Sequence, residues 1–125
     1  MAGTLTISML SDGTNSTSST NCIKGSARAW GSFANTGSSL TVNSAYNVSS
    51  VTYVSAGQYN VNFTNAFADS KYAIVATSGS ASTSLIAAMQ PSGSFPPTTT
   101  SCRLNTNYAN AAPYDGTCLY FAVFS

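Results

Sequence analysis

The segment 58–63 alternates strictly between apolar and amide side chains. Tyr59, Val61 and Phe63 occupy one set of alternate positions, and the other set is Gln58, Asn60 and Asn62. A β-strand has a side-chain period of two, so this pattern predicts a strand with one buried face and one face in water. Such strands are typical of antiparallel sheets that cover a core on one side.

Further strand-like runs follow one another along the chain, separated by turn residues such as Gly, Ser and Asn. We expect strands at 23–33, 39–43, 45–54, 58–64, 72–78, 85–90, 101–108 and 117–124. No window shows a helical period with capping residues. A chain of 125 residues is long enough for one domain with its own core. Seven or eight short strands predict an all-β fold, an antiparallel β-sandwich.

The first 22 residues differ from the rest. Leu5, Ile7 and Met9 alternate with small polar residues, a Ser-Asp-Gly turn follows at 11–13, and 14–20 is a polar run. We interpret 1–22 as an extended N-terminal arm ahead of a sandwich domain at 23–125. About 20 extended residues span up to roughly 65 Å, so the arm would reach a neighbouring subunit or anchor the chain to a larger structure. A first strand of the same sheet is the alternative.

Four segments of the first 76 residues carry distinctive sequence motifs: Arg28-Ala-Trp30, Ala45-Tyr-Asn-Val-Ser-Ser-Val51, Gly57-Gln-Tyr-Asn-Val-Asn-Phe63-Thr-Asn-Ala66 and Lys71-Tyr-Ala-Ile-Val75. This combination resembles a domain of the tail-fibre and tail-associated structural proteins of tailed bacteriophages. The matching stretches lie within 1–76, and the remainder matches only through a closing aromatic strand. The resemblance implies a β-sandwich, and no catalytic motif comes with it.

Charged residues make up only 6% of the chain, and its formal net charge is +1. Soluble proteins usually carry interspersed surface charges. A surface rich in Ser, Thr, Asn and Gly suits an assembled particle better than a free cytosolic protein. The charge is too small to neutralise a run of phosphates or to hold an anionic membrane. We therefore expect no nucleic-acid partner and no membrane insertion. We also find no secretory leader, so the mature chain is expected to start near Met1.

The composition argues against an enzyme. The chain has no His, so neither a Ser-His-Asp nor a Cys-His site can be built. Asp12 and Asp115 each precede Gly, where Asp commonly forms turns, and Asp69 lies in a loop before a strand. We expect no catalytic residue, no metal and no cofactor.

Three cysteines, Cys22, Cys102 and Cys118, lack metal-ligand spacing. A disulfide between Cys102 and Cys118 across a hairpin is one possibility, worth about 3 kcal/mol in the chain-entropy model. Three buried or half-buried thiols are the favoured interpretation, because phage proteins assemble in a reducing cytoplasm.

Two expected loops, 92–98 and 105–115, carry aromatic and amide residues. Aromatic faces hold the apolar C–H patches of sugars, and planar amides or carboxylates bind their hydroxyls. The candidate ligand-binding residues are Arg103, Tyr108, Asn110, Tyr114 and Asp115. The alternative is that these tyrosines cap the core.

The last strand is apolar on both faces, since Leu119, Phe121 and Val123 alternate with Tyr120, Ala122 and Phe124. Such a strand is central in a two-layer core or is covered by another subunit. We therefore assign Tyr120 and Phe124, together with the single tryptophan, Trp30, to oligomer or core contacts.

Together these observations favour a phage virion structural protein, a non-catalytic tail-fibre or tail-tip component that mediates attachment to the host surface. It would be a homotrimer located in the tail and assembled in the host cytoplasm. Its partners would be its own copies, other tail proteins through the arm, and a host surface glycan. The alternatives are a capsid decoration or head-fibre protein, a lectin-like carbohydrate-binding module and, among enzymes, a depolymerase.

Overall fold

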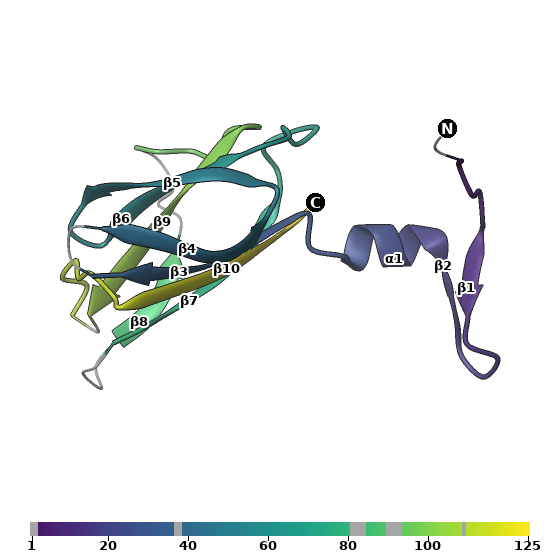
Figure 1. The fold of residues 1–125 in the computed structure, drawn as a ribbon, viewed down its shortest axis with the longest axis horizontal. Helices are drawn as coiled ribbons and strands as arrows, with labels where there is room; N and C mark the ends of the chain where they lie inside the picture. The colour runs from purple at the N-terminus through teal and green to yellow at the C-terminus, as the bar shows by residue number, and fades with distance from the viewer. Residues whose placement is uncertain (1–2, 37–38, 81–84, 90–93, 109) are drawn as a thin grey trace.

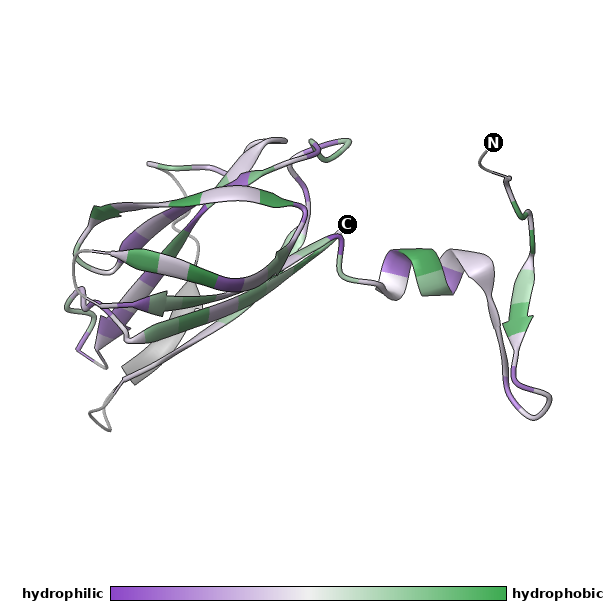
Figure 2. Ribbon diagram, in the orientation of Figure 1, coloured by the Kyte–Doolittle hydropathy of each residue, from purple (hydrophilic) through white to green (hydrophobic). Residues whose placement is uncertain are grey.

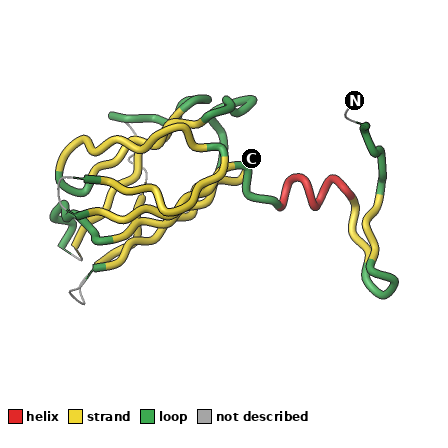
Figure 3. The backbone as a smooth tube through the Cα atoms, in the orientation of Figure 1, coloured by secondary structure: helices red, strands yellow, loops and turns green. Residues whose placement is uncertain are grey.

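Two four-stranded antiparallel sheets stack face to face, and a small hairpin and one helix lie outside them (Figure 1). The computed structural model describes residues 3–36, 39–80, 85–89, 94–108 and 110–125, with the backbone alone for 85–89. Figure 3 shows that the stacked part consists of strands and loops. The predicted all-β antiparallel sandwich is confirmed.

The first sheet has the strand order β4-β3-β10-β7 and the second has the order β5-β6-β9-β8. The strands of the first sheet are β3 (Ala29–Asn35), β4 (Leu40–Tyr46), β7 (Ala73–Gly79) and β10 (Cys118–Phe124). Those of the second are β5 (Val48–Ser55), β6 (Gln58–Phe63), β8 (Leu85–Met89) and β9 (Ser101–Tyr108). All pairings within both sheets are antiparallel.

The core lies between the sheets and is built from alternate residues of their strands. On β6 the buried positions are the three apolar residues that the sequence pattern indicated. Phe33 of β3 stacks on Phe121 of β10, with ring centroids 5.6 Å apart and 5° between the ring planes. The buried apolar residues are Ala29, Phe33, Tyr59, Val61, Phe63, Phe67, Cys102, Leu104, Leu119, Phe121 and Val123.

The chain crosses from one sheet to the other at Asn47, between β4 and β5. The sequence placed this break three residues earlier, at 44. Asn47 has a φ of 54°, a left-handed conformation that Asn tolerates better than most residues. Its side-chain oxygen accepts a hydrogen bond from the backbone N of Asn65 at 2.7 Å, and its amide nitrogen donates to the carbonyl of Arg28 at 3.1 Å. The side chain therefore holds three separate segments together at the crossing.

The N-terminal segment contains β1 (Met9–Ser11), β2 (Ser16–Ser18) and α1 (Ser19–Gly25). The expected strand at 23–33 is wrong in its first part, because 23–25 belong to α1, 26–28 are a connection, and β3 begins only at Ala29. The Ser18 side chain caps the helix by accepting a hydrogen bond from the backbone N of Asn21 at 3.1 Å. No residue of α1 is buried, so the helix has no amphipathic pattern by which the sequence could reveal it. We call residues 3–25 the arm.

The arm extends away from the sandwich at the end where the C-terminus lies (Figure 1). Apolar residues colour β1 and part of α1 in Figure 2. The large apolar side chains exposed on the arm are Leu5, Ile7, Met9, Leu10 and Ile23. These residues contribute nothing to the core of the sandwich.

All three cysteines are free thiols. Cys102 is buried on the inner face of β9, whereas Cys118 is a half-buried, outward position of β10 in the other sheet. The two thiols therefore lie on opposite sides of the β10 sheet, and a disulfide between them is excluded in this fold. The favoured interpretation, buried and half-buried thiols, is confirmed.

Candidate functional site

Amide and hydroxyl side chains cover the outer surface of β6 and β9. Inward and outward residues alternate along both strands, and the register pairs Asn60 with Arg103. The outward residues are Gln58, Asn60, Asn62, Ser101, Arg103, Asn105 and Asn107. We call this surface the amide face. Arg103 is the only charged residue in the four strands of this sheet.

Arg103 is held in place by two contacts. Its Nε donates a hydrogen bond to Oδ1 of Asn60 at 2.8 Å. Its guanidinium carbon lies 3.5 Å from the centroid of the Phe95 ring, a stacking arrangement that is favourable for arginine. A surface hollow of about 260 Å³ opens beside this group, lined by Asn60, Ser94, Phe95, Pro96, Thr98, Ser101, Cys102 and Arg103. We call it the Arg103 hollow.

The loop that carries Phe95 is tied to the sandwich just beyond the aromatic ring. Thr98 donates its backbone N to the carbonyl of Ser101 at 2.9 Å, and its side-chain oxygen accepts from the backbone N of Ser101 at 3.0 Å. Tyr72 donates its hydroxyl to the carbonyl of Thr98 at 2.9 Å. These bonds hold the end of the loop that follows Phe95 against the sandwich, next to the Arg103 hollow.

Tyr108, the last residue of β9, lies together with Asn110 and Tyr114 of the segment that follows the strand. The rings of Tyr108 and Tyr114 are 4.4 Å apart between centroids. Tyr108 donates its backbone N to the carbonyl of Ala112 at 2.8 Å, and Oδ1 of Asn110 accepts from the backbone N of Ala112 at 3.1 Å. The turn is stabilised by its own residues, and the paired rings form its surface.

Asp115 connects this turn to the β5–β6 hairpin. Its Oδ1 accepts from the backbone N of Gly57 at 2.7 Å and from the hydroxyl of Tyr59 at 3.1 Å. Its Oδ2 accepts from the hydroxyl of Tyr53 at 3.0 Å. Both carboxylate oxygens are engaged by donors of the protein, so this group holds the fold together where the sequence suggested a sugar contact.

The structure separates the five predicted ligand-binding residues into two groups. Tyr108, Asn110, Tyr114 and Asp115 cluster at one end of the sandwich. Arg103 lies five residues before Tyr108 on β9, about 16 Å away along a strand. Residues 92, 93 and 109 of the two expected loops are outside the described residues. The sequence did not indicate that Asn60 and Phe95 are neighbours of Arg103. Both residues belong to patterns described above, Asn60 to the amide row of 58–63 and Phe95 to an aromatic loop.

The outer surface of the other sheet carries aromatic and aliphatic side chains beside small hydroxyl residues, and Ser44, Ser32 and Thr77 share a row with Tyr120. The register aligns Tyr46, Trp30, Ala122 and Val75 in one row across all four strands. Tyr120 lies in the next row, and Phe124 lies at the end of β10. Exposed fractions are 58% for Tyr46, 39% for Trp30, 63% for Val75 and 45% for Tyr120. We call the outward residues Trp30, Tyr46, Val75, Tyr120, Ala122 and Phe124 the aromatic face.

The four strands under the aromatic face contain no charged residue. Trp30 and Tyr120 point away from the space between the sheets, so neither is part of the core of a single chain. A shallow hollow of about 290 Å³ lies between β7 and β10, with Val75, Tyr120 and Ala122 in its lining.

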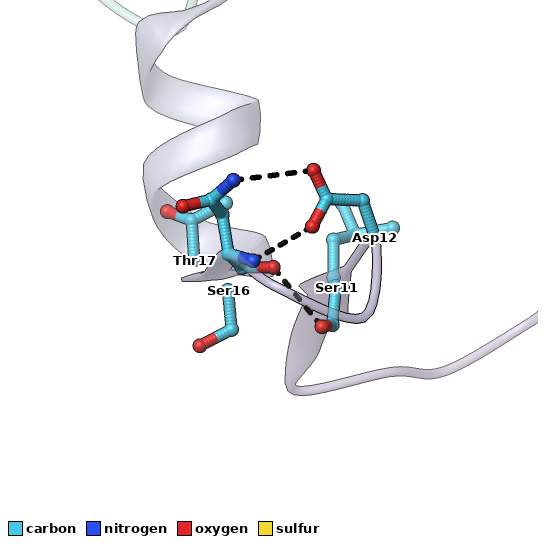
Figure 4. A pocket seen from close by; sticks show the side chains of 6 residues that line it. Ser11, Asp12, Ser16 and Thr17 are labelled. Carbon is cyan, nitrogen blue, oxygen red and sulfur yellow. Dashed lines mark hydrogen bonds between the residues drawn. The ribbon is translucent and has the colours of Figure 1, made fainter.

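The hollow shown in Figure 4 belongs to the hairpin of the arm. Asp12 accepts hydrogen bonds from the backbone N of Asn15 at 2.7 Å and of Thr14 at 3.0 Å. These bonds hold the pKa of Asp12 below its ordinary value. The carboxylate forms the turn that the Asp-Gly pair predicted, which accounts for its presence.

Burial raises the pKa of several side chains of the sandwich. It raises the pKa of Tyr59 to about 12, and the nearby negative charge of Asp115 acts in the same direction. It raises the pKa of the Cys102 thiol to about 12, and it raises the pKa of Tyr72 as well. In the folded protein these groups keep their protons at pH values where the unfolded chain loses them.

We therefore expect the protein to lose stability in alkali. The ordinary pKa values are 9.0 for the thiol and 10.0 for tyrosine, so the contribution of these groups is complete below about pH 9 and falls as pH rises towards 12. Urea midpoints measured between pH 8 and pH 11.5 will show the decline. A Cys102→Val variant should have a flatter curve between pH 9 and 10. A midpoint that stays constant up to pH 11.5 would contradict the assignment.

Within the described residues, no group of three or more His, Cys, Asp or Glu side chains is placed to hold a metal ion. No helix in that part of the chain is long and apolar enough to span a membrane. No family model, curated protein or solved structure matches this chain.

Proposed function

We propose that this chain is a structural protein of a bacteriophage virion, a tail-fibre or tail-tip component that attaches the particle to the host surface without catalysis. The observation that carries the proposal is the contrast between the two outer surfaces of the sandwich. One carries an uncharged group of aromatic and aliphatic side chains, and few charges with many aromatic residues are typical of the centre of a contact between subunits. The other carries amides, hydroxyls and a positioned arginine, as a glycan-binding surface requires. The resemblance of 1–76 to phage tail proteins supports the same role.

The aromatic face serves contacts between copies in a homotrimer. An exposed patch of this kind on a soluble domain commonly marks an interaction site. It carries no charge that a second copy would repel, which favours identical chains as the partner. Three copies would also multiply weak host contacts through effective concentration.

The arm attaches the trimer to other tail proteins. Its exposed apolar residues are not needed by the sandwich, and hairpin and helix together extend the chain beyond the domain (Figure 1). Burial of these side chains against another protein would remove apolar surface from water. The arm thus supplies an attachment surface that is separate from the amide face.

The carboxylates support binding without turnover. Asp12 forms its own turn, Asp69 accepts the backbone N of Lys71 at 2.7 Å, and both oxygens of Asp115 accept hydrogen bonds within the fold. An acid/base pair needs two such groups near one another and open to substrate. These three lie in separate parts of the chain and have structural partners.

Gold-labelled antibody against this protein, applied to intact virions and viewed by electron microscopy, tests the proposal. We expect label at the tail tip or fibres, and we expect the same antibody to block adsorption to host cells. Label spread over the head would overturn the tail assignment and favour a capsid decoration protein. Release of sugar from host polysaccharide by the purified protein would overturn the non-catalytic assignment.

A further inference from the structure

The Arg103 hollow contains a cation that no carboxylate of the described residues pairs with. The three aspartates accept hydrogen bonds elsewhere in the fold. Within the described residues, Arg103 donates a hydrogen bond through its Nε alone, to Asn60. Across the described part of the chain, the terminal NH₂ groups of Arg103 are left for another acceptor. A planar guanidinium that is already oriented loses little rotamer freedom when it binds.

The geometry points to a ligand with a carboxylate. The two terminal nitrogens of a guanidinium match the two oxygens of a carboxylate, and this bidentate pairing is among the strongest hydrogen-bonded contacts in proteins. The stack on Phe95 and the bond to Asn60 fix the direction in which the fork points. Such a site binds one planar anion, and it does so with a defined orientation.

The surroundings of Arg103 favour a sugar as the carrier of that carboxylate. Ser94, Thr98 and Ser101 line the hollow, where the hydroxyls of Thr98 and Ser101 also bond each other at 2.9 Å, and the amides of β6 and β9 continue beside it. These groups both donate and accept hydrogen bonds, as sugar hydroxyls do. An acidic peptide would bring several negative charges to a sheet that has one cation. The volume of about 260 Å³ lies just below the range of about 300 to 1,000 Å³ typical of larger ligands, which suits a single sugar unit.

We propose that the Arg103 hollow binds a uronic acid unit of an acidic host polysaccharide, with its carboxylate on the Arg103 fork and its hydroxyls on the neighbouring amides and hydroxyls. This inference rests on the proposed attachment function and names its ligand class and its site. The site lies away from the Tyr108 and Tyr114 turn, so the two surfaces can be tested separately.

The test is NMR titration of the full-length protein with galacturonate, galactose, the methyl ester of galacturonate and inorganic phosphate. We expect galacturonate to bind and to shift the Nε–H signal of Arg103 and the side-chain amide of Asn60. Arg103→Gln should weaken binding by about tenfold to a hundredfold, the value of a charged hydrogen-bonded contact. Arg103→Lys keeps the charge but loses the fork, and should weaken binding by about tenfold. Arg28→Gln, which removes the same charge from an exposed site at the base of the arm, should leave it unchanged.

Three results would overturn the inference: unchanged galacturonate affinity in Arg103→Gln, equal affinity for galactose or the methyl ester, or tighter binding of phosphate than of galacturonate. The last outcome would assign the hollow to phosphate groups. Circular dichroism of each variant shows whether it is folded. If Arg103→Gln does not fold, Phe95→Leu, which removes the aromatic stack at an exposed position, provides the second test, with an expected loss of affinity. Label at the tail tip together with no uronate binding would refute this inference and leave the attachment function standing.

Discussion

Replacement of Gly57 with alanine is expected to lower the free energy of unfolding by about 3 to 4 kcal/mol. Gly57 has a φ of 67° in the β5–β6 turn, where an alanine side chain is strained. A Cβ atom there would overlap the carbonyl oxygen of Thr106 and lie 2.9 Å from the backbone N of Tyr114. Thr106 also donates its backbone N to the carbonyl of Gly57 at 2.8 Å, so relief of the overlap breaks a hydrogen bond. Urea unfolding followed by far-UV circular dichroism measures the loss.

A second substitution tests the same junction from its other side. Asp115→Ala removes the acceptor for the backbone N of Gly57 and for the hydroxyls of Tyr53 and Tyr59. We expect it to lower the free energy of unfolding by about 2 to 4 kcal/mol, because it removes the acceptor of two partly buried donors, the backbone N of Gly57 and the hydroxyl of Tyr59. Gly25→Ala is the control, since a Cβ there meets no atom within 4 Å, and it should remain within about 0.5 kcal/mol of wild type. Wild-type stability in both Gly57→Ala and Asp115→Ala would show that the turn does not dock on this segment.

The strands were predictable because their information is local. Period-two alternation in 58–63 identified both the strand and its buried side, and the expected strand at 101–108 coincides with β9. Turn residues between such runs also fixed the fold class, since short strands with frequent turns leave few other arrangements. The pairing of strands into two sheets was not predicted, because it depends on contacts between distant parts of the chain.

The features that the sequence hid are of two kinds. Helix α1 is fully outside the core, so it is set by a capping serine and not by an apolar stripe, which is the signal that periodicity detects. The junction at Asp115 joins residues 58 positions apart, and an Asp-Gly pair looks the same whether its carboxylate bonds locally or far away. Asp12 has the first role and Asp115 the second. The Arg103 hollow was predicted only in part: the sequence indicated the arginine as a binding residue, but not its partners on β6 and in the loop.

The role of the aromatic face depends on which molecule covers it, and this cannot be derived from the sequence of one chain. The apolar alternation of β10 indicated two covered faces, and the structure shows that one of them packs in the core while the other faces outwards. Burial of apolar surface against a partner stabilises an assembly by about 25 cal/mol for each Å² removed from water. A second copy would recover this free energy without any charge pairing, and this is the physical argument for the homotrimer that we propose.

Val75→Lys is expected to dissociate the proposed trimer, raising its dissociation constant by about a hundredfold or more. Val75 is the most exposed member of the aromatic face and lies on the edge strand β7, so a lysine there is tolerated in the monomer. In the assembly it would bury a charge without a partner, which costs about 2 to 5 kcal/mol. Sedimentation velocity over a concentration series should show wild type at three times the chain mass of 12.8 kDa and the variant at the mass of one chain.

Thr52→Lys provides the matched control, because it adds the same charge at an exposed position on β5, the edge strand of the other sheet. It should keep the oligomeric state of wild type. If both variants remain trimers, the contact between copies lies elsewhere, and the arm, with its own exposed apolar residues, becomes the surface to mutate. If wild type is a monomer even at high concentration, the chain does not associate through this face at all. That result would overturn the homotrimer, and under the proposed attachment function avidity for the host would then depend on the number of copies on the particle.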